Sequence, residues 1–332
     1  MILGHERQIK YLETVLKKNR MAHAYLFYGP EHVGKLTIAK SFAKALRCQK
    51  KIIPISRDRG ESVSLFGECG ECVSCAGIEN DADPEVLRLD ALHTLISEKE
   101  TRKEIPIKDI RELKRIFSLA PLGNAWRVVI INEAEKMSAE AANAFLKLLE
   151  EPGAQTLILL VTSSRELLFS TIMSRTQQIQ FSLVPHAEIN GFLEKKRLPA
   201  EERKELCRIA RGRPGVLHTL LEDKDALAEE RKFLAGVSTG IEEGDIPAAF
   251  RIHEHIASDP ELRVKYIECA MEILRAKLLL ANTPETALFF AKKLKNALRM
   301  RTLIETTNVN PRLCLDAFTL GVQSGSKAAA YK

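Results

Sequence analysis

The chain has 332 residues, of which 45% are hydrophobic and 28% are charged. This length exceeds one compact domain, and the composition is that of an ordinary folded protein, so two or three domains are expected. The formal net charge of +6 permits contact with nucleic acid without requiring it, because a solvated surface gives the same balance. The N-terminal residues contain no apolar targeting segment and no apolar run reaches bilayer length, which predicts a cytoplasmic protein without a membrane partner.

The first part of the chain alternates short apolar runs with amphipathic segments. Residues 24–28 predict a buried strand, and apolar residues then follow helical spacing over 36–46. The further expected elements, in chain order, are a strand over 85–89, a helix over 107–118, a strand over 128–131, a helix over 139–149 and a strand over 157–162. Strands that alternate with helices predict a mainly parallel sheet covered by helices on both faces.

Beyond residue 185 the pattern is helical throughout. Three short helices are expected over 186–195, 200–210 and 215–221. From about residue 225 the helices become longer, with interruptions near 238–240 and 281–284.

A glycine-rich loop, residues 29–37, follows the first strand. Gly29, Gly34 and Lys35 match the phosphate-binding pattern Gly-x4-Gly-Lys-Ser/Thr, but Leu36 stands at the hydroxyl position. The glycines let backbone N–H groups surround phosphates and the lysine neutralises their charge, whereas the missing hydroxyl would hold Mg2+. The alternative is a simple glycine turn with a surface lysine, and the strand–loop–helix context disfavours it.

A second expected magnesium-binding position follows the strand over 128–131. Asn132 and Glu133 stand where nucleotide-hydrolysing folds usually carry Asp-Glu. Glu133 could still orient a water molecule, but asparagine brings no charge to Mg2+. Because Mg2+ relies on one or two protein ligands besides phosphates, the two losses predict no bound Mg2+ and no hydrolysis. Binding of ATP or ADP is left open.

Four of the seven cysteines form a candidate metal site. Cys69, Cys72 and Cys75 are spaced Cys-x2-Cys-x2-Cys, and Cys48 at the end of the preceding helix is the natural fourth ligand. In a reducing compartment this spacing favours a metal over disulfides, with a chance cluster as the alternative. Four thiolates leave no position for water, which predicts a structural Zn2+. The remaining cysteines are expected to be buried free thiols: Cys207, Cys269 and Cys314.

Arg175 and the basic helix over 292–301 each have two competing interpretations. Arg175, in Ser174-Arg175-Thr176, lies near the end of the α/β part. Such an arginine is usually solvated or salt-bridged, and the alternative is an arginine finger offered to a neighbour's γ-phosphate. The helix over 292–301 is interpreted as a solvated face, because no aromatic residues for base stacking lie between its basic residues.

Taken together, these segments resemble the delta-prime subunit family of the bacterial replicative clamp loader, an AAA+ relative of the gamma/tau motor subunits. The resemblance covers nearly the whole chain. Thr162-Ser163 falls at the position called sensor one, Ser174-Arg175-Thr176 resembles the Ser-Arg-Cys motif of the family, and the four cysteines match its zinc module. The other matching segments are 2–5, 21–27, 107–113, 143–152 and 308–311.

The departures from the gamma/tau pattern favour delta-prime. Both magnesium ligands are lost, His32 replaces a loop glycine, and Gly215 takes the position of the sensor-two arginine of motor subunits. Two features differ from delta-prime as well: Thr176 replaces the usual cysteine, and an extra polar stretch over 50–64 widens the zinc module.

The resemblance implies an α/β AAA+ fold, with a RecA-like parallel sheet between two layers of helices. The expected domains are a nucleotide-binding-like domain over 1–182 with a zinc module in 48–75, a three-helix lid over 183–223 and an all-α collar over 224–332.

The resemblance also implies a mechanism. The chain would be a non-motor subunit of the DNA polymerase III holoenzyme that presents Arg175 to ATP on an adjacent gamma/tau subunit. Its expected partners are the gamma/tau and delta subunits, the sliding clamp transiently, and primed DNA through the assembled complex. No intrinsic ATPase or polymerase activity is expected. The degenerate nucleotide site would comprise Gly29, Gly34, Lys35, Thr37, Asn132, Glu133 and Thr162.

Two other functions remain open. In a gamma/tau-like motor, Thr37 would supply the missing hydroxyl, although the one-residue shift turns its side chain away by about 100°. A zinc-stabilised DNA-binding adaptor is an alternative of another class. It predicts tight DNA binding by the isolated chain, which the slight positive charge does not favour.

Overall fold

The computed structural model describes residues 2–50, 65–93, 95, 104–119, 126–153, 155–243, 245–307 and 309–323. Residues 51–64 of the extra polar stretch and residue 308 of the matching segment 308–311 therefore lie outside the described residues. The chain divides into two compact units, Met1–Glu222 and Asp223–Lys332.

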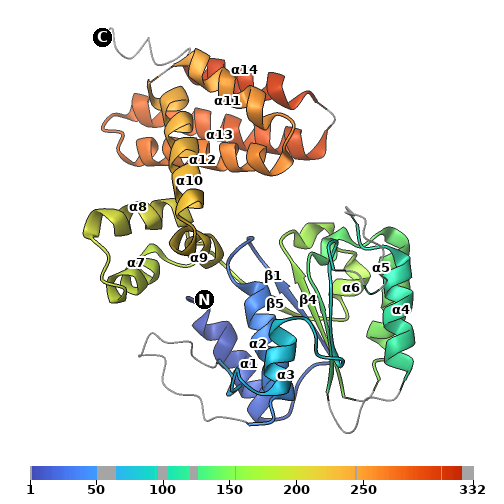
Figure 1. The fold of residues 1–332 in the computed structure, drawn as a ribbon. Helices are drawn as coiled ribbons and strands as arrows, with labels where there is room; N and C mark the ends of the chain where they lie inside the picture. Colours follow the sequence, from blue (N-terminus) through green and yellow to red (C-terminus); the bar gives the residue numbers. More distant parts are fainter. Residues whose placement is uncertain are drawn as a thin grey trace. The chain divides into compact units, whose positions relative to one another are not determined.

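A parallel sheet forms the centre of the first unit (Figure 1). Its five strands are β1 (Ala24–Tyr28), β2 (Val86–Leu89), β3 (Arg127–Ile131), β4 (Thr156–Thr162) and β5 (Gln177–Gln180), in the order β2-β3-β4-β1-β5. The register pairs the last residue of β1 with the last residues of β4 and β5. The loops that follow these strands therefore leave the sheet at one edge.

The strand side chains alternate between two apolar layers. Tyr25 and Phe27 of β1 are buried in one layer, and Leu26 is buried in the other. The first layer includes residues of α1 (Glu6–Lys17), α2 (Lys35–Arg47) and α3 (Val73–Glu79). The second includes residues of α4 (Ile107–Ser118), α5 (Ala139–Glu150) and α6 (Ser170–Met173). The predicted parallel sheet with helices on both faces is confirmed (Figure 1).

The sequence pattern did not predict β5. Three of its four residues are glutamines, and of the four only Ile179 is buried. An edge strand pairs on one side alone, so β5 needs little apolar surface to be held beside β1. Short 3-10 turns, Ala134–Lys136 and Arg165–Leu167, follow β3 and β4.

Three short helices complete the first unit, as the sequence predicts: α7 (His186–Lys195), α8 (Ala200–Ala210) and α9 (Pro214–Glu222). The second unit consists of α10 (Lys224–Ser238), a π-helical turn (Thr239–Glu243), α11 (Ile246–Ile256), α12 (Pro260–Leu279), α13 (Pro284–Thr306) and α14 (Pro311–Gln323). Asp223, Asp245 and Thr283 cap three of these helices by accepting backbone N–H groups with their side chains.

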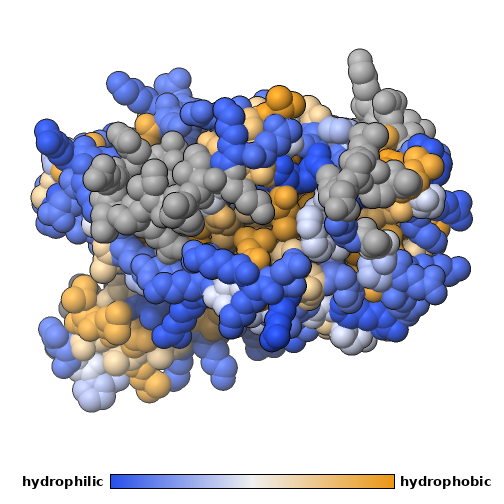
Figure 2. Space-filling model, turned by 90° about the horizontal axis from the view of Figure 1, so that it is seen from below, coloured by the Kyte–Doolittle hydropathy of each residue, from blue (hydrophilic) through white to orange (hydrophobic). Residues whose placement is uncertain are grey.

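The second unit buries its own apolar core, which includes Ile256, Tyr266, Leu274 and Leu315. The predicted interruptions fall at the ends of α10 and α12. On the face displayed in Figure 2, hydrophilic residues cover much of the coloured surface, with hydrophobic residues between them.

Candidate functional site

The glycine-rich loop leaves β1 at the carboxyl edge of the sheet and leads into α2. This is the place where open parallel sheets bind ligands. Gly29, His32 and Gly34 all have positive φ, at 140°, 59° and 102°. The loop thus has the curled backbone that the glycine spacing predicts.

Gly29 is required by a close backbone approach. A Cβ atom at this position would lie 2.0 Å from the carbonyl oxygen of Phe181, just beyond β5. The Phe181 N–H donates to the Tyr28 carbonyl oxygen at 2.8 Å, which fixes the two segments side by side. Gly34 has no atom within 4 Å of such a Cβ, so its constraint is conformational alone.

Gly29→Ala is therefore expected to destabilise the first unit far more than Gly34→Ala. The clash involves backbone on both sides, and we expect a loss of about 3–5 kcal/mol, against about 1–2 kcal/mol of conformational strain for Gly34→Ala. Urea unfolding of both variants measures this difference. Equal losses would contradict the close approach.

Lys35 has its ammonium group turned back onto its own loop. The residue is only 6% exposed. Its Nζ donates to the carbonyl oxygens of Gly29, at 2.6 Å, and Pro30, at 2.5 Å. Burial lowers the pKa of Lys35 from 10.5 to about 8, although the carboxylates of Glu31 and Glu135 raise it. The cation that would neutralise phosphates is bonded to loop carbonyls in this structure.

The lowered pKa of Lys35 predicts a pH-dependent stability. Between about pH 8 and 10.5 the unfolded chain keeps a proton that the folded chain has lost, so the free energy of unfolding rises with pH. A shift of this size corresponds to roughly 3 kcal/mol, present as a penalty below pH 8 and gone above pH 10.5. Urea unfolding of the wild type should show this rise relative to Lys35→Met. Parallel profiles would contradict it.

The residues after Lys35 do not offer a hydroxyl at the expected place. Leu36 packs its partly buried side chain against the apolar layer around α2. Thr37, the third residue of α2, is exposed. The apolar packing of Leu36 explains why this position tolerates a leucine.

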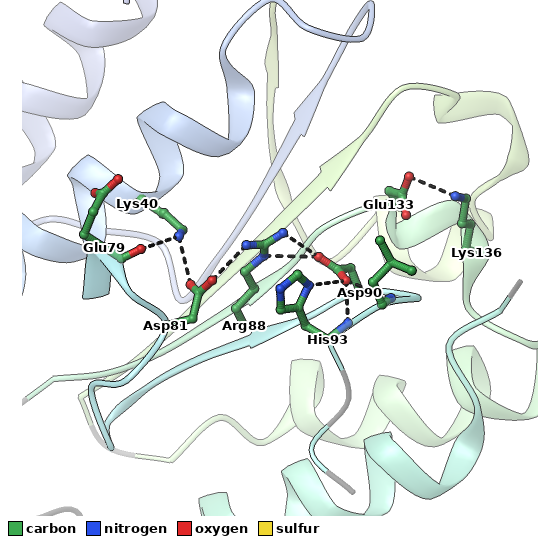
Figure 3. Close-up of polar contacts among 9 residues, drawn as sticks. Lys40, Glu79, Asp81, Arg88, Asp90, His93, Glu133 and Lys136 are labelled. Carbon is green, nitrogen blue, oxygen red and sulfur yellow. Dashed lines mark hydrogen bonds and ion pairs between the residues drawn. The ribbon is translucent and has the colours of Figure 1, made fainter. Parts of the chain in front are cut away.

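The segment after β3 also reaches the carboxyl edge of the sheet. The backbone N–H of Asn132 donates to Leu89 O at 2.9 Å, which continues the pairing with β2. Glu133 has a positive φ of 53°, and its carboxylate lies 2.9 Å from Nζ of Lys136 (Figure 3). Glu133 is therefore engaged in a local, exposed ion pair.

Glu135 was not singled out by the sequence. Its Oε1 accepts the backbone N–H of Ser163 at 3.0 Å and the Ser163 hydroxyl at 2.7 Å. Thr162 is 1% exposed, and its hydroxyl accepts the Ser164 N–H at 3.1 Å. Glu135 thus joins the segment after β3 to the end of β4, and the Thr162 hydroxyl is turned inward.

Two further segments touch the glycine-rich loop. The Gly215 N–H at the start of α9 donates to the His32 carbonyl oxygen at 2.7 Å. A Cβ atom on Gly215 would lie 2.9 Å from the same oxygen, so a side chain there needs the loop or α9 to shift. On another side, Nε2 of the buried His5 lies 3.0 Å from Val33 O. The loop is therefore held by residues from both ends of the first unit.

Arg175 lies just after α6, on a different segment from the loop. Its side-chain contacts are with Thr171 O, at 3.1 Å, the Ser174 hydroxyl, at 3.4 Å, and Glu150, at 2.8 Å. The side chain is 37% exposed. The candidate nucleotide residues thus lie together at the carboxyl ends of the strands. Arg175 lies apart from them and contacts Thr171, Ser174 and Glu150.

The four candidate cysteines converge. Their sulfur atoms all lie within 4.8 Å of one another in the set Cys48, Cys69, Cys72 and Cys75. The Cys69 and Cys75 sulfurs are 4.0 Å apart. A tetrahedral zinc with Zn–S bonds of about 2.3 Å requires sulfurs about 3.8 Å apart, so the set fits a metal ion of this kind. The cluster joins the end of α2 to the start of α3.

Backbone donors support thiolates in this cluster. The Cys69 N–H donates to the Cys48 sulfur at 3.2 Å, and the Cys72 N–H donates to the Cys69 sulfur at 3.3 Å. Burial raises the pKa of Cys72, but the N–H groups of Gln49 and Cys75 and the neighbouring thiols outweigh burial and lower this pKa from 9.0 to about 6. Burial raises the pKa of the Cys48 and Cys75 thiols. Thiolates are the form that binds metal.

A network of ion pairs ties the cysteine-bearing segment to the sheet (Figure 3). Asp81, just after α3, pairs with Lys40 of α2 at 2.9 Å and with Arg88 of β2 at 2.8 Å. Arg88 also pairs with the buried Asp90, which accepts from His93 at 2.8 Å. These contacts anchor the segment after α3 against α2 and β2.

In the part of the chain that the structure describes, none of the helices is both long and apolar enough to cross a bilayer.

Comparisons with known proteins give the family. A sequence model of the family described as DNA polymerase III, delta subunit, matches residues 4–185. The tau subunit of DNA polymerase III from Bacillus subtilis is 31% identical over 194 residues, which are 58% of this chain and 31% of that protein. The delta' subunit from Pseudomonas aeruginosa is 34% identical over 197 residues, which are 58% of this chain and 54% of that protein.

The match thus spans about a third of the tau subunit and about half of the delta' subunit. Among solved structures, a gamma subunit-related protein of DNA polymerase III from Thermotoga maritima is 19% identical, with a TM-score of 0.48, over 96% of this chain and 99% of that chain. Because the family match covers more than half of the 332 residues, this protein belongs to the DNA polymerase III delta subunit family, among the clamp-loader subunits of the delta-prime, gamma and tau kind.

Proposed function

We propose that this chain is a non-motor, delta-prime-like subunit of the bacterial replicative clamp loader. In this role it assembles with gamma/tau and delta subunits and helps them load the sliding clamp onto primed DNA. It donates Arg175 to ATP bound on a neighbouring gamma/tau subunit. Its own AAA+ domain serves as a rigid part of the ring, with α7–α9 as the lid and the second unit as the collar.

The state of the glycine-rich loop carries the proposal. Leu36 packs into the apolar layer at the position where Mg2+ needs a hydroxyl. Asn132 replaces the second, acidic ligand, so the charge that develops on a transferred phosphoryl group has no metal to neutralise it. Lys35 is bonded to the loop's own carbonyls. These features support a loop that does not turn over nucleotide, and the role requires no nucleotide to be bound there.

Arg175 supports the second half of the proposal. Its side chain is 37% exposed and follows the short helix α6 near the end of the α/β part, where a neighbouring subunit can reach it. A planar guanidinium with several N–H donors suits the phosphoryl oxygens of a transition state. Because the chain's own loop lacks the magnesium ligands, the finger is of use only in trans.

The cysteine cluster has a separate role in the proposal. Its four thiolates would hold one Zn2+ with no open position, so the metal would stabilise the fold rather than take part in catalysis. The metal would clamp the end of α2 to α3.

Steady-state ATP hydrolysis by the purified chain tests the non-motor role. We expect turnover at background level, with and without Mg2+, for the wild type and Lys35→Met alike. Mg2+-dependent turnover that Lys35→Met abolishes would show instead a gamma/tau-like motor. Tight DNA binding by the isolated chain, measured by fluorescence anisotropy, would favour the zinc-stabilised adaptor.

A further inference from the structure

Arg175 is held against a carboxylate of its own subunit. Nη2 of Arg175 lies 2.8 Å from Oε1 of Glu150, the last residue of α5. Nη1 donates to Thr171 O at 3.1 Å and lies 3.4 Å from the Ser174 hydroxyl. The guanidinium therefore spans the gap between α5 and α6, and Glu150 is the charged residue among these acceptors.

The end of α5 is a favourable place for a cation. The last carbonyl groups of a helix carry partial negative charge, and Glu150 adds a full negative charge to them. Glu151 follows as the exposed residue that ends the helix. The side chain of Glu150, rather than that of Glu151, is the one that reaches Arg175.

The ion pair is weak enough to be exchanged. Arg175 and Glu150 have 37% and 48% of their side chains exposed, and exposed pairs of this kind contribute little to stability. A phosphoryl group carries more negative charge than a carboxylate and can accept two N–H groups of a guanidinium at once. It can therefore replace Glu150 as the partner of Arg175.

Building on the proposed function of Arg175, we propose that Glu150 is a latch on this residue. In the free subunit Glu150 holds the guanidinium against the end of α5. When the subunit meets a neighbour with bound nucleotide, Arg175 leaves Glu150 for the phosphate. The backbone contact with Thr171 belongs to α6 and does not depend on Glu150. Arg175 must therefore break its ion pair with Glu150 before it binds the phosphate, and this lowers the affinity of the subunit for its neighbour.

The latch predicts a specific kinetic signature for Glu150→Gln. The glutamine keeps the length of the side chain and removes its charge, so Arg175 is released more easily. In a mixture of gamma/tau, delta, clamp and primed DNA, we expect the concentration of this chain that half-saturates ATP hydrolysis to fall about two- to fivefold. The saturated rate should stay unchanged, because Glu150 is absent from the engaged state.

Glu151→Gln is the matched control, since it removes the same charge one residue along and should behave as the wild type. A Glu150→Gln variant that matches Glu151→Gln, or that lowers the saturated rate, would overturn the latch. Arg175→Ala distinguishes the two proposals. If Arg175→Ala leaves the rate unchanged, the proposed function fails and the latch fails with it. If Arg175→Ala lowers the rate while Glu150→Gln does nothing, the latch alone is wrong.

Discussion

Replacing Arg175 with alanine is expected to abolish the contribution that this chain makes to ATP hydrolysis in the assembled clamp loader. An arginine finger supplied in trans is worth about 10³–10⁵ in turnover at the site that it serves. The loss would therefore silence one site of the complex and leave sites served by other subunits intact. Steady-state hydrolysis by gamma/tau, delta, clamp and primed DNA, with either form of this chain added, measures the effect.

Two further variants sharpen that experiment. Arg175→Lys keeps the positive charge but loses the planar fork, so it should restore only part of the stimulation. Arg115→Ala removes another exposed arginine, paired with Glu112 of the same helix at 2.7 Å, and should behave as the wild type. Stimulation by Arg175→Ala equal to that of the wild type would rule out the finger.

Replacing Cys75 with serine is expected to release one bound Zn2+ and to destabilise the first unit. Cys75 is fully buried and lies in α3 among the other three thiols. Structural zinc contributes about 10–16 kcal/mol of binding free energy in small zinc domains, and losing one ligand forfeits much of it. We expect the melting temperature to fall by on the order of 10 °C. Metal analysis and thermal unfolding of the purified protein measure both effects.

Cys207→Ser is the matched control for the zinc prediction. Cys207 is a buried free thiol of α8, outside the cluster. Serine there should cost some stability through packing but leave the metal content unchanged. A wild-type protein without zinc, or a Cys75→Ser protein that keeps it, would contradict the metal site.

The sequence predicted the central sheet well because burial left a clear pattern. Residues 24–28, 128–131 and 157–162 are continuous apolar runs, as expected of strands covered on both faces, and all three form strands of the sheet. The edge strand β5 escaped prediction because its glutamines carry no such pattern. What holds β5 is pairing with β1, which is a property of the fold rather than of its own residues.

The parts of the candidate site that the sequence predicted are those in which residues of one type recur at a fixed spacing. The four cysteines are an example, because their spacing favoured a shared metal ion and the structure places their sulfur atoms within 4.8 Å of one another. Contacts between distant segments left no local signal. The Gly215 N–H donates to the His32 carbonyl oxygen, although the two residues are far apart in the sequence. Glu135, in the turn after β3, accepts the N–H of Ser163, which follows β4. Both contacts depend on how the sheet and helices are arranged.

The ion pair between Glu150 and Arg175 also could not be predicted from the sequence. Glu150 directly follows the predicted amphipathic helix over 139–149 and is the last residue of the observed helix α5. A charged residue at such a position is expected from the sequence to belong to the solvated face of the helix. Only the placement of α6 beside the end of α5 makes it the partner of Arg175.

Lys35→Met and Arg175→Ala, compared in the assembled complex, distinguish a role of the arginine finger from a role of the chain's own glycine-rich loop. In the proposed function, this chain acts through Arg175 and not through its own glycine-rich loop. ATP hydrolysis stimulated by primed DNA should therefore be unchanged by Lys35→Met and lose one site's contribution with Arg175→Ala. Loss of hydrolysis with Lys35→Met, together with full activity of Arg175→Ala, would show that the chain works as a motor.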